Sequence, residues 1–169
     1  VRVPLGTSDL RVSRVCLGTM TFGSPVAFDD AVELVRHAEA QGVNFVDTAN
    51  MYEGYDRVAG SSGGVAEEIV GAAIAGARDR YIVATKLGMR VGPEPWDEFT
   101  SPEAIRIQLD RSLTRLGTDY VDVYYLHKPD PHTPDDDIVA ALGAELAAGR
   151  IRAWGVSNHD ADELAGLVA

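Results

Sequence analysis

The chain has one cysteine, no long apolar run and little positive charge, and each of these scarcities excludes a class of structure or partner. A single cysteine, Cys16, rules out a disulfide within the chain, so we expect an intracellular, cytoplasmic protein. No stretch approaches the roughly 18 apolar residues of a membrane span, and no secretory signal is recognisable. The net charge of −11 argues against nonspecific binding to nucleic acid or to an anionic membrane surface. We therefore expect neither a nucleic-acid nor a membrane partner.

What is present is the composition of a globular domain. With 169 residues, 46% of them hydrophobic and 24% charged, the chain can bury one sizeable core. Five times in succession, a strand-like apolar run is followed by an amphipathic helical pattern. Such alternation predicts an α/β fold with a parallel sheet and right-handed crossovers. Because a (β/α)8 TIM barrel takes about 250 residues, we expect residues 1–169 to form one domain containing its first five units.

The expected elements follow from turn residues, caps and periodicity. Residues 1–13 predict a β-hairpin, and residues 14–169 the five strand–helix units. Cys16 lies in an apolar run and is expected to be a small buried residue. Asp29 is the expected N-cap of the first helix, with Leu34 on its buried face, and Ser101 the N-cap of the third. The expected core strands are residues 15–20, 44–47, 81–86, 121–127 and 153–158, and the expected helices are residues 29–41, 66–77, 102–116, 135–149 and a segment from about 160.

Polar residues stand at the C-terminal ends of four expected strands, where a parallel barrel gathers its functional side chains. They are Asp47, Lys86, His127 and the pair Ser157 and Asn158. Lys86 is informative because the chain has thirteen arginines and only two lysines. A lysine is a compact charge that can alter the pKa of a neighbour in a way that arginine does not.

The chemistry of these groups suits protonation of an oxygen that gains negative charge. Tyr52, on the loop after Asp47, can reach Lys86, whose ammonium would lower the phenol pKa from about 10. Asp47 can pair with Lys86, and His127 can donate a hydrogen bond to a substrate oxygen. This set fits reduction of a carbonyl by hydride. Ser157 and Asn158 carry hydroxyl and amide groups of the sort that hold a carboxamide, such as that of nicotinamide.

The chain resembles the aldo-keto reductase family. The motifs that carry the resemblance occur in family order along the whole chain: LGTMTFG at 17–23, DTA at 47–49 followed by Tyr52, ATK at 84–86, LH at 126–127 and GVSN at 155–158. The loop after Tyr52 is longer than in compact members. The family's sixth to eighth strands, which supply the ring stacked on nicotinamide and the cationic loop that grips the adenosine phosphates, lie outside the five units.

The resemblance implies a (β/α)8 barrel that binds NADPH or NADH and reversibly reduces a small aldehyde or ketone. It implies a catalytic tetrad of Asp47, Tyr52, Lys86 and His127, with Tyr52 as the general acid. It implies that Ser157 and Asn158 hold the carboxamide of the cofactor. It also places the backbone of Gly18, Thr19 and Met20, together with Asp47, near the cofactor, and makes the N-terminal hairpin a plug at the bottom of the barrel.

Each candidate also has a structural interpretation. Asp47 alone could cap its loop, Lys86 could be a solvated cation, and His127 could be a hydrogen-bonded core histidine. His127 and His132 with the acids at 135–137 could suggest a metal site, but the acids fit a helix start better, so we expect no metal. Whether Trp96, Met51 and Phe22 line a pocket or pack in the fold stays open, and the glycine run at 60–64 indicates a surface loop.

Three functions are compatible with the sequence. The first is the nicotinamide-dependent carbonyl oxidoreductase. The second is a cofactor-binding sensor or channel-associated subunit of the same fold with little turnover, which the resemblance permits. The third is an unrelated barrel enzyme, such as an isomerase or a metal hydrolase, which rests on fold analogy alone. The sequence does not name the substrate, the choice between NADP and NAD, or the oligomeric state.

Overall fold

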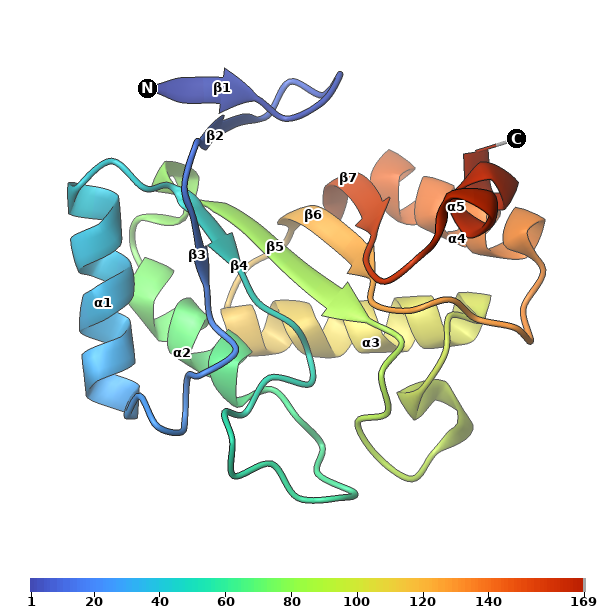
Figure 1. The fold of residues 1–169 in the computed structure, drawn as a ribbon, viewed down its shortest axis with the longest axis horizontal. Coiled ribbons are helices and arrows are strands. Elements are labelled where there is room, and N and C mark those ends of the chain that lie inside the picture. Colours follow the sequence, from blue (N-terminus) through green and yellow to red (C-terminus); the bar gives the residue numbers. More distant parts are fainter. Residues whose placement is uncertain (169) are drawn as a thin grey trace.

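A curved, parallel sheet of five strands organises the computed structural model, which describes residues 1–168 (Figure 1). The strands lie side by side in chain order, and each is followed by a helix. They are β3 (Cys16–Gly18), β4 (Phe45–Asp47), β5 (Ile82–Leu87), β6 (Val121–Leu126) and β7 (Ile151–Val156). The helices are α1 (Phe28–Ala40), α2 (Val65–Ile74), α3 (Pro102–Leu116), α4 (Asp135–Ala147) and α5 (Ala161–Val168), with short 3-10 turns η1 (Arg78–Arg80) and η2 (Pro95–Asp97).

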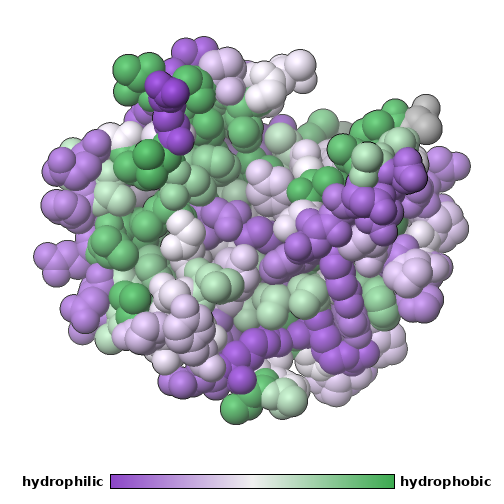
Figure 2. All heavy atoms as spheres, viewed as in Figure 1, coloured by the Kyte–Doolittle hydropathy of each residue, from purple (hydrophilic) through white to green (hydrophobic). Residues whose placement is uncertain are grey.

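The two faces of the sheet are buried to different extents. The outer face packs against the helices, where alternate strand residues such as Val83 and Tyr124 meet Ile69, Leu109 and Leu142 in the main core. Burying each such aliphatic side chain contributes about 1.5–3 kcal/mol. On the inner face a smaller apolar cluster lies under the N-terminal hairpin. Figure 2 shows apolar residues exposed on this side of the molecule, beneath the hairpin.

The hairpin, β1 (Arg2–Pro4) paired antiparallel with β2 (Arg11–Ser13), sits at the N-terminal ends of the strands (Figure 1). Its attachment is specific, because the buried Asn44 side chain accepts a hydrogen bond from the Ser13 amide (2.7 Å) and donates one to the Arg11 carbonyl (3.0 Å). The Ser13 hydroxyl accepts from the Asn44 amide in return, at 3.1 Å. The hairpin thus closes one end of the sheet and leaves the other end to the long loops.

The parallel sheet, the hairpin and the order of the elements confirm the fold expected from the sequence. The third helix begins and ends where its caps predicted. The Ser101 hydroxyl accepts a hydrogen bond from the Ala104 amide, and Gly117 ends the helix in a left-handed conformation with φ of 62°. Such a conformation is open to glycine because it lacks a Cβ.

Three local predictions were wrong. Helix α1 begins before Asp29, with an extended Ala27 as its N-cap, so Asp29 stands in the first turn. That position is equally favourable for a carboxylate, because the helix dipole favours negative charge there. Leu34 is 40% exposed, because α2 is the only helix within residues 1–168 that packs closely beside α1. Cys16 is also exposed, because β3 is an edge strand of the sheet.

The helices are all short relative to a bilayer. Within residues 1–168, none is both long enough and apolar enough to cross a membrane.

Candidate active site

Three polar residues meet at the C-terminal ends of neighbouring strands, opposite the hairpin. Asp47 is the last residue of β4, Lys86 is the second-last residue of β5, and His127 directly follows β6. Parallel pairing fixes their relative heights, since the His127 amide donates to the Leu87 carbonyl at 2.9 Å. The side chains of Asp47 and Lys86 consequently point to the same inner face of the sheet.

The Lys86 ammonium is buried and fully hydrogen-bonded. Its Nζ donates to Asp47 Oδ2 at 2.7 Å, to the Thr48 carbonyl at 2.9 Å and to the Tyr52 hydroxyl at 3.1 Å. Three acceptors match the three protons that an ammonium carries. Lys86 is only 6% exposed, so the Asp47 carboxylate compensates the cost of holding its charge away from water.

Tyr52 lies between Lys86 and His127. Its ring meets the His127 imidazole edge-on, with centroids 5.8 Å apart and planes at 81°, and Lys86 Nζ lies 4.6 Å from the Tyr52 ring centroid. Burial, together with the positive charge of Lys86, lowers the pKa of His127 from 6.5 to about 4. The imidazole is therefore neutral at pH 7.

The position of the remaining imidazole proton follows from hydrogen bonding. His127 Nδ1 is buried and has no partner among residues 1–168. An unpaired buried N–H is less tolerable than an unpaired lone pair, so the neutral ring is best assigned with its proton on Nε2. In that form His127 is a hydrogen-bond donor.

A hollow of about 430 Å³ opens on the inner face beside this cluster, and we call it the inner hollow. It is lined by Cys16, Gly18, Phe45, Asp47, Lys86, Tyr125, Val156 and Ser157. Four of the residues that the sequence predicted to be catalytic or cofactor-binding therefore line one concave surface, namely Gly18, Asp47, Lys86 and Ser157.

Ser157 and Asn158 continue from β7 at the same end of the sheet. Asn158 adopts a left-handed backbone (φ 60°), and its Nδ2 donates to the His127 carbonyl at 2.7 Å and to Ser157 Oγ at 3.1 Å. These bonds leave the Asn158 Oδ1 as an acceptor and the Ser157 hydroxyl proton as a donor. An adjacent donor and acceptor match the oxygen and amide nitrogen of a carboxamide, so the pair fits a nicotinamide.

The loop after β3 is tied to Asp47. The Thr19 amide and hydroxyl both donate to the Asp47 backbone carbonyl, at 3.0 and 3.1 Å. Thr19 is buried, Gly18 lines the inner hollow, and Met20 is 54% exposed. Of these three residues, only Gly18 borders the hollow directly.

A scan against protein-family models matches residues 14–167 to the aldo/keto reductase family. The chain belongs to the aldo/keto reductase family.

Similar proteins agree with this assignment. The chain is 34% identical over 183 residues to an NADH-specific methylglyoxal reductase of Escherichia coli, covering 96% of this chain and 53% of the relative. It is 35% identical over 164 residues to a probable voltage-gated potassium channel subunit beta of Arabidopsis thaliana, covering 95% and 47%. A Klebsiella pneumoniae aldo/keto reductase crystallised with NADP and acetate matches with a TM-score of 0.77 and 34% identity over 94% of this chain and 50% of that one. The chain thus spans about half the length of the relatives it matches.

Two contributors to the site of this aldo/keto reductase chain were not foreseen. One is the Thr48 carbonyl, the third acceptor of Lys86, which leaves no mark in sequence because any residue supplies a carbonyl. The other is Gln108, whose side chain bonds both loops beside the site. A signal for Gln108 existed, because a glutamine on the otherwise apolar face of a helix, between Ile105 and Leu109, indicates a buried polar contact.

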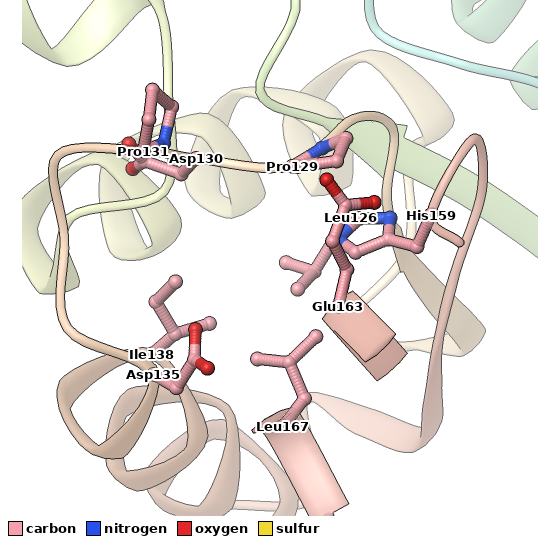
Figure 3. Close-up of a pocket in the computed structure, with 9 residues that line it drawn as sticks. All are labelled: Leu126, Pro129, Asp130, Pro131, Asp135, Ile138, His159, Glu163 and Leu167. Carbon is pink, nitrogen blue, oxygen red and sulfur yellow. The ribbon is translucent and has the colours of Figure 1, made fainter. Parts of the chain in front are cut away.

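Phe22 and Trp96, for which the sequence left a pocket or a packing role open, line neither the inner hollow nor a second one. Phe22 is buried in the main core, and the Trp96 carbonyl accepts a hydrogen bond from Gln108. A second hollow of about 220 Å³ lies between α4, α5 and the loop after β6 (Figure 3). Its walls include Ile138 and Glu163 but none of the four clustered residues. Within residues 1–168, no three histidine, cysteine or acidic side chains lie close enough to hold a metal ion.

Proposed function

We propose that this chain carries the catalytic residues of a nicotinamide-dependent carbonyl reductase. The observation that carries the proposal is the 3.1 Å hydrogen bond between the Lys86 ammonium and the Tyr52 hydroxyl, beside a half-buried carboxylate and a neutral imidazole. Tyr52 is the general acid, and Asp47, Lys86 and His127 complete the tetrad. The substrate is a small aldehyde or ketone.

The proton transfer follows from the contacts. When negative charge develops on a carbonyl oxygen, the Tyr52 phenol gives it a proton and becomes a phenolate. The Lys86 ammonium stabilises that phenolate, since a neighbouring positive charge favours the ionised form. Asp47 and the Thr48 carbonyl keep the ammonium in place and charged.

His127 has a different task. With a pKa of about 4, it is neutral at pH 7 and cannot serve as a strong acid. Its Nε2–H can instead donate a hydrogen bond to the carbonyl oxygen and strengthen as charge develops there. This division assigns proton donation to Tyr52 and polarisation to His127.

The reduced nicotinamide supplies the hydride, and this chain's residues orient it. Ser157 and Asn158 would hold the carboxamide. Gly18 and the Asp47 side chain, which line the inner hollow, would lie beside the cofactor, with Thr19 and Met20 continuing the same loop. We take NADPH as the cofactor and NADH as the alternative. Relatives of both kinds exist, since the Klebsiella pneumoniae structure contains NADP and the Escherichia coli reductase is named NADH-specific.

The test is turnover of NADPH with methylglyoxal, a small reactive aldehyde, by the purified protein. Tyr52→Phe should lower kcat by about 10²–10⁴-fold, the usual contribution of a positioned general acid. Tyr55→Phe is the matched control, because Tyr55 lies on the same loop but is 70% exposed. Equal turnover by Tyr52→Phe and the parent would show that Tyr52 is not the proton donor.

A second candidate is a cofactor-binding subunit that regulates a partner and turns over little. The similarity to a probable potassium channel subunit beta favours it. Tight NADPH binding by a protein that does not consume methylglyoxal or other small aldehydes would support this alternative. Rapid turnover in the absence of any partner would count against it.

We also propose that residues 1–169 belong to one domain, with residues 1–13 as a plug and residues 14–169 as five strand–helix units. The hydrogen bonds between Asn44 and the hairpin support this arrangement. Limited proteolysis that released the hairpin while the remainder kept its melting temperature would contradict it.

A further inference from the structure

Gln108 makes an unusually complete set of hydrogen bonds behind the site. It projects from α3, is 1% exposed, and joins two loops of the chain, the one after β4 and the one at residues 88–100. Its Oε1 accepts from Asn50 Nδ2 at 2.8 Å and from the Gly88 amide at 3.1 Å. Its Nε2 donates to the carbonyls of Trp96 and Phe99, at 3.0 and 3.3 Å. Every donor and acceptor site of the side-chain amide is therefore used.

The orientation of this amide is fixed by main-chain groups. The Gly88 amide can only donate and the Trp96 and Phe99 carbonyls can only accept, so the oxygen must face Gly88 and the nitrogen must face the loop. Asn50 consequently presents its NH2 group to Gln108 Oε1. A reversed amide would oppose like groups on both sides.

The two residues bound by Oε1 flank the proposed acid and its neighbouring ammonium. Asn50 lies two residues before Tyr52, and Gly88 lies two residues after Lys86. The backbone amide of Asn50 also donates to the Lys86 carbonyl at 3.1 Å, which ties the two segments together. One buried oxygen thus holds the chain on both sides of the Tyr52–Lys86 contact.

We propose that Gln108 is a positioning residue that sets the Tyr52–Lys86 contact and holds the loop at residues 88–100 beside the site. We call the four hydrogen bonds of Gln108 the clamp. Its expected effect on kinetics rests on the proposed function, whereas its expected effect on the order of the two loops does not. A displacement of about 1 Å of a reacting group can cost about 10²-fold in rate, so loss of the clamp should lower kcat more than it changes KM.

Two substitutions separate the two sides of the clamp. Gln108→Leu removes all four hydrogen bonds at nearly the same volume. Gln108→Glu keeps the length and keeps an acceptor for Asn50 and Gly88. Burial favours the neutral carboxyl, which can still donate to one carbonyl, and its ionisation at higher pH would repel the carbonyls of Trp96 and Phe99.

Ser112→Ala is the matched control. Ser112 lies one turn further along α3, is fully buried, and its hydroxyl has no partner among residues 1–168. Its removal perturbs the same helix in the same core without touching either loop.

The experiment combines amide hydrogen exchange with steady-state kinetics on the intact protein. Gln108→Leu should speed exchange in residues 48–64 and 88–100 at least tenfold and lower kcat about tenfold or more, whereas Ser112→Ala should change neither. Gln108→Glu should resemble the parent at low pH and show an additional loss of kcat as pH rises. If Gln108→Leu does not fold, the pH profile of Gln108→Glu decides.

Unchanged exchange in both loops and a kcat within twofold of the parent for Gln108→Leu would overturn the inference, as would a Gln108→Glu profile parallel to that of the parent. If the parent itself does not reduce any small carbonyl, the proposed function fails. The exchange measurement then still decides whether Gln108 orders the two loops.

Discussion

Removal of the Asp47 carboxylate gives the sharpest test of the charge arrangement at the site. In Asp47→Ala the Lys86 ammonium, whose side chain is 8% exposed, loses its counter-ion but keeps the Thr48 carbonyl and the Tyr52 hydroxyl as acceptors. Removing one partner of a buried pair costs about 3–5 kcal/mol. Because the Asp47 side chain is 28% exposed, we expect the lower end, about 3 kcal/mol.

Urea denaturation at pH 7 measures this loss. With a slope of about 2 kcal/mol per molar urea, the midpoint should fall by about 1.5 M. Asp47→Asn, which keeps an acceptor oxygen, controls for shape. The double variant Asp47→Ala with Lys86→Met removes the stranded charge, so it should recover about 2 kcal/mol relative to the sum of the single losses. A midpoint shift below about 0.5 M, together with additive single effects, would refute the claim that the carboxylate compensates a buried ammonium.

Three further outcomes follow from other buried groups. Folding lowers the pKa of His127 from 6.5 to about 4, so as pH falls from 6.5 to 4 only the unfolded chain binds a proton at this residue. The free energy of unfolding should therefore fall by about 3 kcal/mol across that window. In urea titrations at several pH values, His127→Gln should remove this part of the acid sensitivity. Glu67 is fully buried and bonded to Arg115 at 2.6–2.7 Å, so Glu67→Ala should lower the free energy of unfolding by about 3 kcal/mol, and a loss under about 1 kcal/mol would contradict the pairing. Asn44→Ala strands the Ser13 amide and should cost about 2 kcal/mol while accelerating hydrogen exchange in residues 1–13; unchanged exchange there would show that other contacts hold the hairpin.

The features of the fold that sequence predicted are those carried by local pattern. Buried parallel strands are apolar runs of β-branched residues, and β5 and β6 were found within one residue of their expected bounds. The bounds of α3 were also predictable, because Ser101, Pro102 and Gly117 each act through their own backbone conformation. Local rules fail where two of them give the same signal. A carboxylate is favoured both at an N-cap and in the first turn, so Asp29 did not locate the start of α1.

The candidate site divides in the same way. Asp47, Lys86 and His127 could be grouped from sequence because each ends a strand and parallel strands end together. Gln108 could not be placed by that argument, since the two partners of its Oε1 lie 20 and 58 residues away and these contacts depend on how α3 packs on the sheet. Cys16 failed for a related reason. Its run is apolar enough for a buried strand, but burial also depends on whether a neighbour covers the edge of the sheet, and within residues 1–168 β3 has only one adjacent strand.

The distribution of lysine and arginine connects the fold to the proposed chemistry. At the opposite end of the sheet, the buried carboxylate of Asp122 is held by Arg78 at 2.7 Å and Arg152 at 2.9 Å, and it also accepts from the backbone of β5. A guanidinium suits that task because its planar fork can bridge several elements and its charge does not titrate. The cation beside the Tyr52 hydroxyl has a different task. A compact ammonium can donate three hydrogen bonds within a small volume, to a carboxylate, a carbonyl and a phenol. The chain has lysine at this position although arginine is its usual cation. In the mechanism that we propose, the site needs a point charge close to the Tyr52 oxygen, because a neighbouring positive charge favours the ionised form of a phenol.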